Sequence, residues 1–362
     1  MLYYLLYPLR EYSIFFNIFK YITFRAVGAS VTAFFLSVFL GPFVIQWLTK
    51  LSVVNAAKRE YAEKIHSFYA AKGTVPTMGG ALIVGSLVLA NLLWGNLENR
   101  FLLLSLLVIV WFGLIGFLDD FIKLKNKNTR GLSSLVKLVG QLILGIGIGT
   151  YLYRDPAFSK FLYIPFLKGA FVALGAWFIP FVVLVLVGTS NALNLTDGLD
   201  GLAVGCLAFA AGAFSILTYL AGRVDFAHYL RIPFVAGSGE LTVFCASLVG
   251  AAVGFLWYNS YPATVMMGDT GSLALGGGLG AVGIFIKSEL VLLIVGGIFA
   301  WEAISVILQV VSFRVFKKRI FLMSPYHHHL QLKGLPESKV TVRLWIVAFI
   351  LALIGLSTLK LR

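Results

Sequence analysis

The chain has 362 residues, of which 59% are hydrophobic and only 12% are charged, and its formal net charge at pH 7 is +14. A soluble protein carries about 25% charged residues, so this composition excludes an ordinary soluble domain and requires lipid to solvate much of the apolar surface. The positive charge has two possible explanations, nucleic-acid binding or membrane topology, and the distribution of Lys and Arg along the chain decides between them.

The first 25 residues are rich in aromatic side chains but are interrupted by charged ones, which favours a segment at the membrane interface over a cleaved signal. Long apolar runs then recur, each near the ~20 residues that a helix needs to cross the hydrocarbon core. They lie at residues 26–48, 76–94, 101–118, 136–153, 169–190, 202–222, 240–258, 270–286, 290–313 and 344–359. We therefore expect an all-α integral membrane protein of about ten transmembrane helices, with residues 1–362 forming a single polytopic domain.

Lys and Arg residues are concentrated in the loops of one predicted face. The loops between spans 1 and 2, 3 and 4, and 9 and 10 hold seventeen of them, counting Lys137 at the start of span 4, and the loops of the opposite face hold seven. Because basic loops mark the cytoplasmic side, this pattern predicts that the first set is cytoplasmic and that both termini are periplasmic. The asymmetry explains most of the positive charge, so no nucleic-acid partner is expected.

Five of the seven aspartates in the chain fall on the predicted cytoplasmic face. They are Asp119, Asp120, Asp197, Asp200 and Asp269. Carboxylates at the ends of membrane helices are costly unless they pair, bind a cation or meet water. Five that converge, with lysines nearby, indicate a divalent cation and an anionic substrate, and oxygen ligands of this kind suit Mg²⁺ or Mn²⁺.

Three motifs carry these aspartates. The first is the Asp119–Asp120 pair, whose side chains point about 100° apart on a helix, so a division of roles is more natural than joint ligation of one ion. The second, residues 191–201, combines Asn, Asp and Gly residues that can bend the backbone and bind a sugar or base. The third, residues 259–272, contains glycines that let a ligand approach closely. Each could be a structural turn alone, but all three on one face favour a site.

Three consecutive histidines, His327, His328 and His329, form a further motif. Zinc ligands usually come with spacers because neighbouring side chains diverge, so a zinc site is the weaker interpretation. Histidines that donate to phosphate oxygens or to a sugar fit better.

Together these motifs resemble the polyprenyl-phosphate N-acetylhexosamine-1-phosphate transferase superfamily, over essentially the whole chain. The resemblance rests on the Asp119–Asp120 pair, the NALNLTDGLDG run of residues 191–201 and the GDTGS motif of residues 268–272. The PTMGG segment at residues 76–80 and the three histidines favour the branch that transfers phospho-N-acetylmuramoyl-pentapeptide. The chain departs from that branch in the stretch before PTMGG and at Gln331, where a glutamate is usual.

The resemblance implies an enzyme of the bacterial plasma (inner) membrane that transfers phospho-N-acetylmuramoyl-pentapeptide from its UDP-activated form to undecaprenyl phosphate. The products would be lipid I and UMP, in the first membrane step of peptidoglycan synthesis. Mg²⁺ as cofactor, contact with membrane lipid and a homodimer are also implied. Two alternatives stay open: a relative that uses another UDP-N-acetylhexosamine, and a secondary transporter. A transporter should hold its ionisable groups near the bilayer midplane, where Glu302 is the main acid in this chain.

The same resemblance implies roles for single residues. Asp269 would be the Mg²⁺ ligand, and the catalytic set would be Asp119, Asp120, Asp269 and His327. Substrate would be bound by Lys72, Thr77, Lys123, Asn191, Asn194, Asp197, Gly198, Leu199, Asp200, Asn259, Gly268, Ser272, Gln309, His328 and His329. A phosphate monoester has a second pKa of about 6 and is largely dianionic at pH 7, so direct attack by the lipid phosphate is favoured over a covalent aspartyl intermediate.

Overall fold

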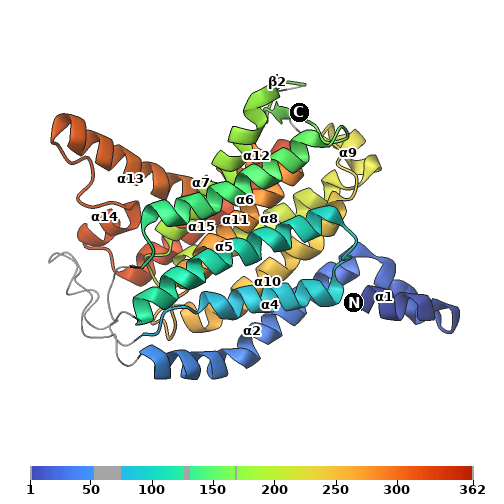
Figure 1. The fold of residues 1–362 in the computed structure, drawn as a ribbon, viewed down its shortest axis with the longest axis horizontal. Coiled ribbons are helices and arrows are strands. Elements are labelled where there is room, and N and C mark those ends of the chain that lie inside the picture. Colours follow the sequence, from blue (N-terminus) through green and yellow to red (C-terminus); the bar gives the residue numbers. More distant parts are fainter. Residues whose placement is uncertain (1, 53–74, 126–130, 168, 361–362) are drawn as a thin grey trace.

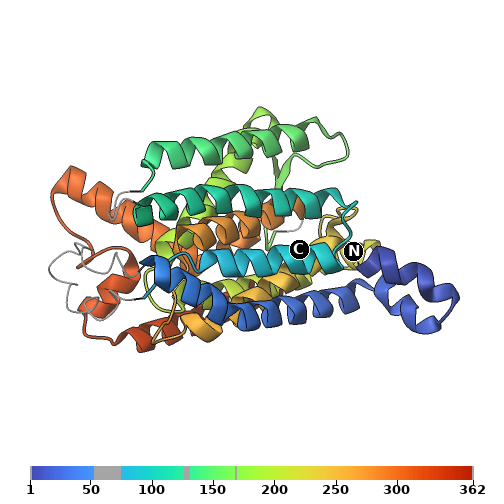
Figure 2. The same cartoon turned by 60° about the horizontal axis from the view of Figure 1, so that its bottom comes forward.

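The computed structural model describes residues 2–52, 75–125, 131–167 and 169–360. Long helices run side by side in one bundle, and eight helices within these ranges are long and apolar enough to cross a membrane (Figures 1 and 2). An all-α membrane fold is thus confirmed, apart from one short hairpin. The ten spans and the sides on which the termini lie stay predictions.

The chain begins with short helices and one long one, then forms a run of helices interrupted by the hairpin. The first half comprises α1 (Leu2–Leu6), η1 (Tyr7–Glu11), η2 (Ile14–Lys20), α2 (Ile22–Ser52), α4 (Gly80–Trp94), α5 (Arg100–Lys125), α6 (Ser134–Arg154), β1 (Phe161–Tyr163), β2 (Phe171–Ala173), η4 (Gly175–Trp177) and α7 (Phe178–Thr196). The second half comprises α8 (Leu202–Ala221), α9 (Val224–Leu230), η5 (Ser238–Glu240), α10 (Leu241–Asn259), α11 (Gly268–Phe285), α12 (Glu289–Val295), α13 (Gly297–Phe316), α14 (Tyr326–Leu332), α15 (Glu337–Ser357) and η6 (Thr358–Lys360).

Two predicted spans differ from the observed elements. In place of a helix from residue 169, β2 pairs antiparallel with β1, Phe161 opposite Ala173, and helix α7 begins only at Phe178. The β-branched and aromatic residues of this stretch suit a strand as well as a membrane helix. The span expected at 290–313 is two helices, α12 and α13, that meet at Gly296, which adopts a non-helical conformation.

Helix α11 lies at the centre of the bundle, and every residue from Thr270 to Phe285 is buried. Its many glycines let neighbouring helices approach its backbone. A Cβ at Gly276 would stand 2.6 Å from the carbonyl oxygen of Thr189 in α7, and one at Gly80 in α4 would stand 2.1 Å from the amide nitrogen of Gly271. Close packing of this kind replaces the hydrophobic drive that helices lack inside lipid.

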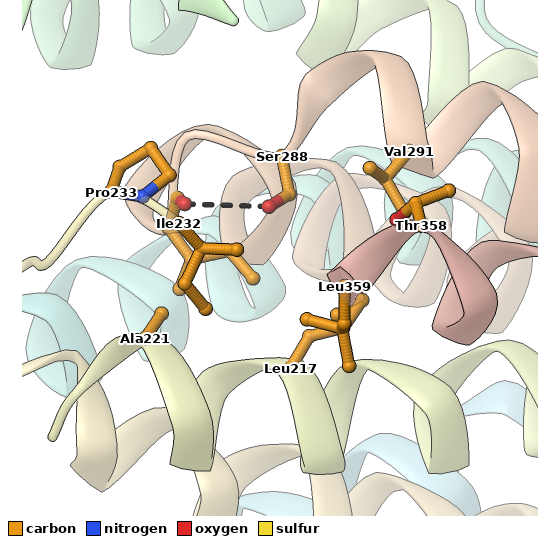
Figure 3. Close-up of a pocket in the computed structure, with 9 residues that line it drawn as sticks. Leu217, Ala221, Ile232, Pro233, Ser288, Val291, Thr358 and Leu359 are labelled. Atoms are coloured by element: carbon orange, nitrogen blue, oxygen red, sulfur yellow. Dashed lines mark hydrogen bonds between the residues drawn. The ribbon is translucent and has the colours of Figure 1, made fainter. Parts of the chain in front are cut away.

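The bundle has two distinct ends. The marked termini both lie toward one end, and α14 lies toward the other (Figures 1 and 2). A small cavity beside the last turns of α8 is lined by Leu217, Ala221, Ile232, Pro233, Ile286, Ser288, Val291, Thr358 and Leu359 (Figure 3). Its volume is about 10 Å³, which is room for about one water molecule, so we interpret it as a packing gap.

Candidate functional site

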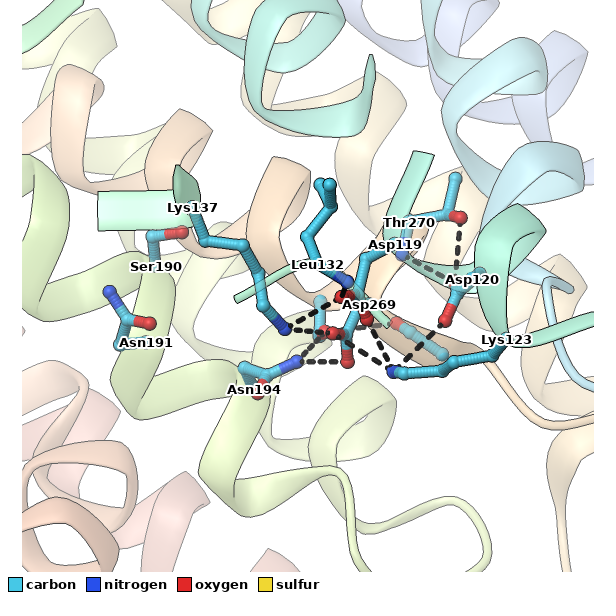
Figure 4. Close-up of polar contacts among 12 residues, drawn as sticks. Asp119, Asp120, Lys123, Leu132, Lys137, Ser190, Asn191, Asn194, Asp269 and Thr270 are labelled. Atoms are coloured by element: carbon cyan, nitrogen blue, oxygen red, sulfur yellow. Dashed lines mark hydrogen bonds and ion pairs between the residues drawn. The ribbon is translucent and has the colours of Figure 1, made fainter. Parts of the chain in front are cut away.

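Three aspartates from two helices meet where α5 ends and α11 begins (Figure 4). One carboxylate oxygen from each of Asp119, Asp120 and Asp269 lies within 4.8 Å of the other two. Gly116, one turn before Asp119, makes this approach possible. A Cβ there would stand 2.1 Å from the carbonyl oxygen of Asp269, so a larger residue would push α11 away from α5.

Two lysines neutralise most of the charge of these carboxylates (Figure 4). The ammonium of Lys123 lies 2.5 Å from Asp119, 3.6 Å from Asp120 and 3.3 Å from Asp269. The ammonium of Lys137 in α6 lies 3.2 Å from Asp119 and 2.9 Å from Asp269. Three carboxylates against two ammonium groups leave one negative charge, which suits the arrival of a cation together with an anionic substrate.

Asp119 and Asp120 are held by different neutral donors. Oδ1 of Asp119 accepts a hydrogen bond from the main-chain N–H of Leu132 at 2.7 Å. Oδ2 of Asp120 accepts from the main-chain N–H of Thr270 at 2.9 Å and from its hydroxyl at 2.8 Å. Both aspartates nevertheless contribute an oxygen to the same cluster, so a joint role toward one cation is geometrically open to them.

Asp269 is oriented by α7. The amide nitrogen of Asn194 donates to Oδ1 of Asp269 at 2.9 Å and also lies 2.7 Å from Oγ of Ser272. The Ser272 hydroxyl in turn donates to the carbonyl oxygen of Gly268 at 2.9 Å. Asn191 lies one turn earlier and donates to Gln141 of α6 at 3.0 Å, so its amide links α7 to α6.

Asp197 connects the end of α7 to the start of α11. Its Oδ2 accepts a hydrogen bond from the main-chain N–H of Gly268 at 3.2 Å. Although part of the residue is exposed, the carboxyl group is enclosed by protein atoms, and this burial raises its pKa well above the ordinary value. The hydrogen bond from Gly268 lowers this pKa, whereas the nearby carboxylates, Asp269 first among them, raise it further.

The rest of the 197–201 turn is fastened to the loop before α11. Oδ2 of Asp200 accepts from the main-chain N–H of Ala263 at 3.0 Å, and Oδ1 of Asn259 accepts from that of Gly201 at 3.2 Å. Leu199 is completely buried. These predicted substrate-binding residues therefore shape the backbone around the cluster, where their side chains already have protein partners.

The segment that holds Thr77 borders the cluster from the side of α4. The main-chain N–H of Gly79 donates to the carbonyl oxygen of Met266 at 2.9 Å, and the carbonyl oxygen of Pro76 accepts from the N–H of Met266 at 2.9 Å. Half-buried Thr77 lies between these two contacts, close to the start of α11. Lys72, the other predicted binding residue of this region, lies outside the described residues.

The three histidines of α14 point to three different places. His327 is completely buried, and its ring lies 3.2 Å from the carboxylate of Glu302. Nδ1 of His328 lies 3.0 Å from Oε1 of Gln331. Nδ1 of His329 accepts from the main-chain N–H of Leu322 at 3.1 Å, and burial, followed by the charge of Lys333, lowers the pKa of His329.

Gln309 fixes the loop that leads to α14. Its side-chain oxygen accepts from the main-chain N–H groups of Ile320 and Phe321 at 3.1 and 2.9 Å, and its nitrogen donates to the carbonyl oxygen of Phe321 at 3.1 Å. The predicted contact of Gln309 with substrate would therefore have to replace these hydrogen bonds to the loop.

Sequence reasoning missed several residues that belong to the cluster or support it. Lys137 entered only as a topological charge, although it contacts two of the three carboxylates. Thr270 and Gln141 carried no local signal, since their partners are far away in the chain. For Lys137, the one available signal was a basic residue at the start of a span on the same face as the aspartates.

Comparison with known proteins places these residues in a family. The model described as glycosyl transferase family 4 matches residues 102–287, a range that contains all three clustered aspartates and the 191–201 run. The chain is 51% identical to the phospho-N-acetylmuramoyl-pentapeptide-transferase of Citrifermentans bemidjiense over 362 residues, which is 100% of both chains. The relatives of the same name from Geobacter sp. and Pelobacter propionicus are 51% and 49% identical, again over 100% of both chains.

Proposed function

Because the chain belongs to glycosyl transferase family 4 and, within it, to the phospho-N-acetylmuramoyl-pentapeptide transferases, we propose that it transfers phospho-N-acetylmuramoyl-pentapeptide from UDP to undecaprenyl phosphate. The products are lipid I and UMP. The observation that supports this reaction most directly is the cluster of Asp119, Asp120 and Asp269 with two lysines, at one end of a bundle of apolar helices.

The donor set of the cluster fits Mg²⁺. This ion takes oxygen ligands at about 2.0–2.1 Å, so two ligands on opposite sides lie about 4.2 Å apart. The three carboxylate oxygens, all within 4.8 Å of one another, need only small movements to meet that requirement. Asp269 is the proposed ligand, and Asp119 and Asp120 offer the remaining carboxylate oxygens. When bound, Mg²⁺ supplies positive charge to the pyrophosphate oxygens and to the departing UMP.

The residues of the chain supply position and charge. The oxygen of the acceptor phosphate forms a bond to the phosphorus that carries the sugar, and the bond from that phosphorus to the bridging oxygen of UMP breaks. Lys123 and Lys137 lie where they can neutralise the phosphate charge that develops. Asp119, fixed by Leu132, positions the acceptor or takes its residual proton.

An apolar groove beside the cluster suits the prenyl chain of the acceptor. It has a volume of about 400 Å³ and runs between α7, α11, α12 and α13. Ala192 and Leu193, immediately before the Asp269 partner Asn194, form part of its wall. An acceptor chain in this groove would bring its phosphate toward the carboxylates while its apolar carbons stay out of water.

We further infer a location in the bacterial plasma membrane, with the cluster on the cytoplasmic side, and assembly as a homodimer. The soluble UDP-linked donor is found in the cytoplasm, and the basic loops on this face agree with that side. Cysteine accessibility in intact cells tests the orientation, and the mass of the detergent-solubilised protein tests the dimer.

The reaction is tested with purified protein, undecaprenyl phosphate and Mg²⁺, by measuring UMP release from each of several UDP-sugars. We expect release with UDP-N-acetylmuramoyl-pentapeptide and at most a trace with UDP-N-acetylglucosamine. Preference for another UDP-N-acetylhexosamine would identify a different transferase. Uptake of a solute into vesicles with no UMP release would identify a transporter.

A further inference from the structure

Glu302 is a completely buried acid in the second turn of α13, and a buried carboxylate is costly in a membrane helix. Its Oε2 accepts a hydrogen bond from the main-chain N–H of His327 at 3.3 Å and lies 3.2 Å from ring atom Nδ1 of the same residue. Its Oε1 has no hydrogen-bond partner among the described residues. Among the described residues, the hydrogen bond and the ion pair of the Glu302 carboxylate are thus both with His327, at the start of α14.

The imidazole of His327 faces the 197–201 turn on its other side. A Cβ added to Gly198 would stand 2.3 Å from Nε2, so the ring lies directly against the backbone of that turn. Neither ring nitrogen has a hydrogen-bond partner within the described part of the chain. The ring therefore packs between the two groups: its Nε2 faces the backbone of Gly198, and its Nδ1 faces the carboxylate of Glu302 in α13.

Gly198 sits between two residues that hold the backbone near the cluster. Asp197 accepts from the N–H of Gly268, and Asp200 accepts from the N–H of Ala263. A shift of the His327 ring would therefore move the turn that connects α7 and α8, and with it the start of α11. Partners that orient metal-ligating side chains commonly contribute 10–100-fold to metal affinity or activity, and we expect an effect at the lower end of this range here.

We propose that Glu302 is a positioning residue for the donor: through His327 it holds the 197–201 turn, and with it the start of α11 at the aspartate cluster, in the shape that binds the UDP-linked donor. The proposal rests on the proposed function for the identity of the nucleotide. It assigns no chemical step to Glu302, whose carboxylate acts only on the main chain and ring of His327.

The test measures two quantities on detergent-solubilised protein: the Kd of UMP by calorimetry, and the kcat and KM of the transfer reaction. Glu302→Leu, which is close in size, should weaken UMP binding and raise the KM of the UDP-linked donor on the order of 10-fold, with kcat within about twofold. Glu302→Gln keeps an oxygen acceptor for the N–H of His327 and should restore both values to within about threefold.

Ser305→Ala is the matched control. It removes a buried hydroxyl one turn further along α13, where Ser305 donates to the carbonyl oxygen of Glu302 at 2.7 Å and has no assigned role in the site. UMP binding and donor KM should stay at the wild-type values in this variant. An equal loss in Ser305→Ala would show a general effect of α13 and would overturn the proposal.

The order of action is tested with His327→Ala and the double variant. If Glu302 acts through His327, the double variant should bind UMP no more weakly than the weaker single variant. Multiplicative losses would overturn the proposal, as would unchanged UMP binding in Glu302→Leu or a fall in kcat without a change in KM. Because UMP binding needs no transfer, a wild-type protein that binds UMP but releases none from the donor contradicts the proposed function, while the Glu302 effect on binding is still measured.

Discussion

Thr270 donates two hydrogen bonds to one carboxylate oxygen of Asp120, from its main-chain N–H at 2.9 Å and from its hydroxyl at 2.8 Å. This relationship joins the end of α5 to the first turn of α11. It fixes one oxygen of Asp120 and leaves the other to face Lys123, at 3.6 Å. The orientation of the carboxylate toward the cluster is thus set by a residue that lies outside the cluster itself.

Removal of the Thr270 hydroxyl should reduce turnover with little change in fold. Thr270→Val keeps the shape and the main-chain donor but loses one of the two hydrogen bonds, so kcat should fall on the order of 10-fold. Thr270→Ser keeps the hydroxyl and should stay close to wild type. Steady-state UMP release with saturating substrates measures the kcat of both variants. Equal kcat in Thr270→Val and wild type would show that this hydroxyl does not orient Asp120.

Gly116 should tolerate no side chain. The Cβ of Gly116→Ala would stand 2.1 Å from the carbonyl oxygen of Asp269, so α5 and α11 must separate and the carboxylates lose their arrangement. We expect activity to fall by at least about 100-fold and the free energy of unfolding by about 1–3 kcal/mol.

Gly147→Ala in α6 is the control for Gly116, since a Cβ at Gly147 meets nothing within 4 Å. It should leave UMP release unchanged and the thermal midpoint at or above the wild-type value, since Ala is a better helix former than Gly. A Gly116→Ala protein with wild-type activity would mean that the close approach of the two helices is not needed.

Loss of Lys137 should have opposite effects on the metal and on the reaction. Lys137→Met removes one of the two ammonium groups facing the cluster, so the remaining carboxylates should attract Mg²⁺ more strongly. The Mg²⁺ concentration for half-maximal activity should therefore fall, while kcat falls on the order of 100-fold because phosphate charge is less well neutralised.

The Mg²⁺ dependence of UMP release measures both effects of Lys137→Met. Lys125→Met, which removes an exposed lysine at the end of α5, serves as the control and should change neither value. A higher Mg²⁺ requirement in Lys137→Met would contradict the charge balance described for the cluster.

Asp197 should make the folded protein less stable as the pH rises. Burial raises its folded-state pKa, so the unfolded chain ionises first, near pH 4, and gains stability relative to the folded chain until the folded pKa is passed. Asp197→Asn removes this difference and keeps an oxygen for the N–H of Gly268. The variant should therefore have a higher thermal midpoint than wild type at pH 8 and the same midpoint near pH 4. A gain that does not grow with pH would contradict the raised pKa.

The sequence predicted the location of the site better than its contacts. Aspartate motifs at span ends on one face indicated convergence, and the structure brings Asp119, Asp120 and Asp269 within 4.8 Å of one another. Lys137 escaped notice because its contact with Asp269 joins residues 132 positions apart, which no local pattern can show. Successive side chains on a helix diverge by about 100°, and the three histidines accordingly make separate contacts, but no local pattern shows that the partner of His327 is Glu302 in α13.

Element boundaries depended on information that hydropathy lacks. A short apolar strand cannot be distinguished from an apolar helix by hydropathy alone, so the predicted span at 169–190 includes β2. The break between α12 and α13 at Gly296 falls inside a continuous apolar run, where a single glycine gives only a weak signal.

We propose that the aspartate cluster binds the Mg²⁺ that supports transfer to undecaprenyl phosphate. The most direct test is the rate of UMP release as a function of Mg²⁺ concentration, for wild type and for Asp269→Asn after treatment with EDTA. We predict no release by wild type without Mg²⁺, full recovery when it is returned, and release by Asp269→Asn at least about 100-fold slower at every Mg²⁺ concentration. Full activity of EDTA-treated wild type, or wild-type rates in Asp269→Asn, would contradict the claim.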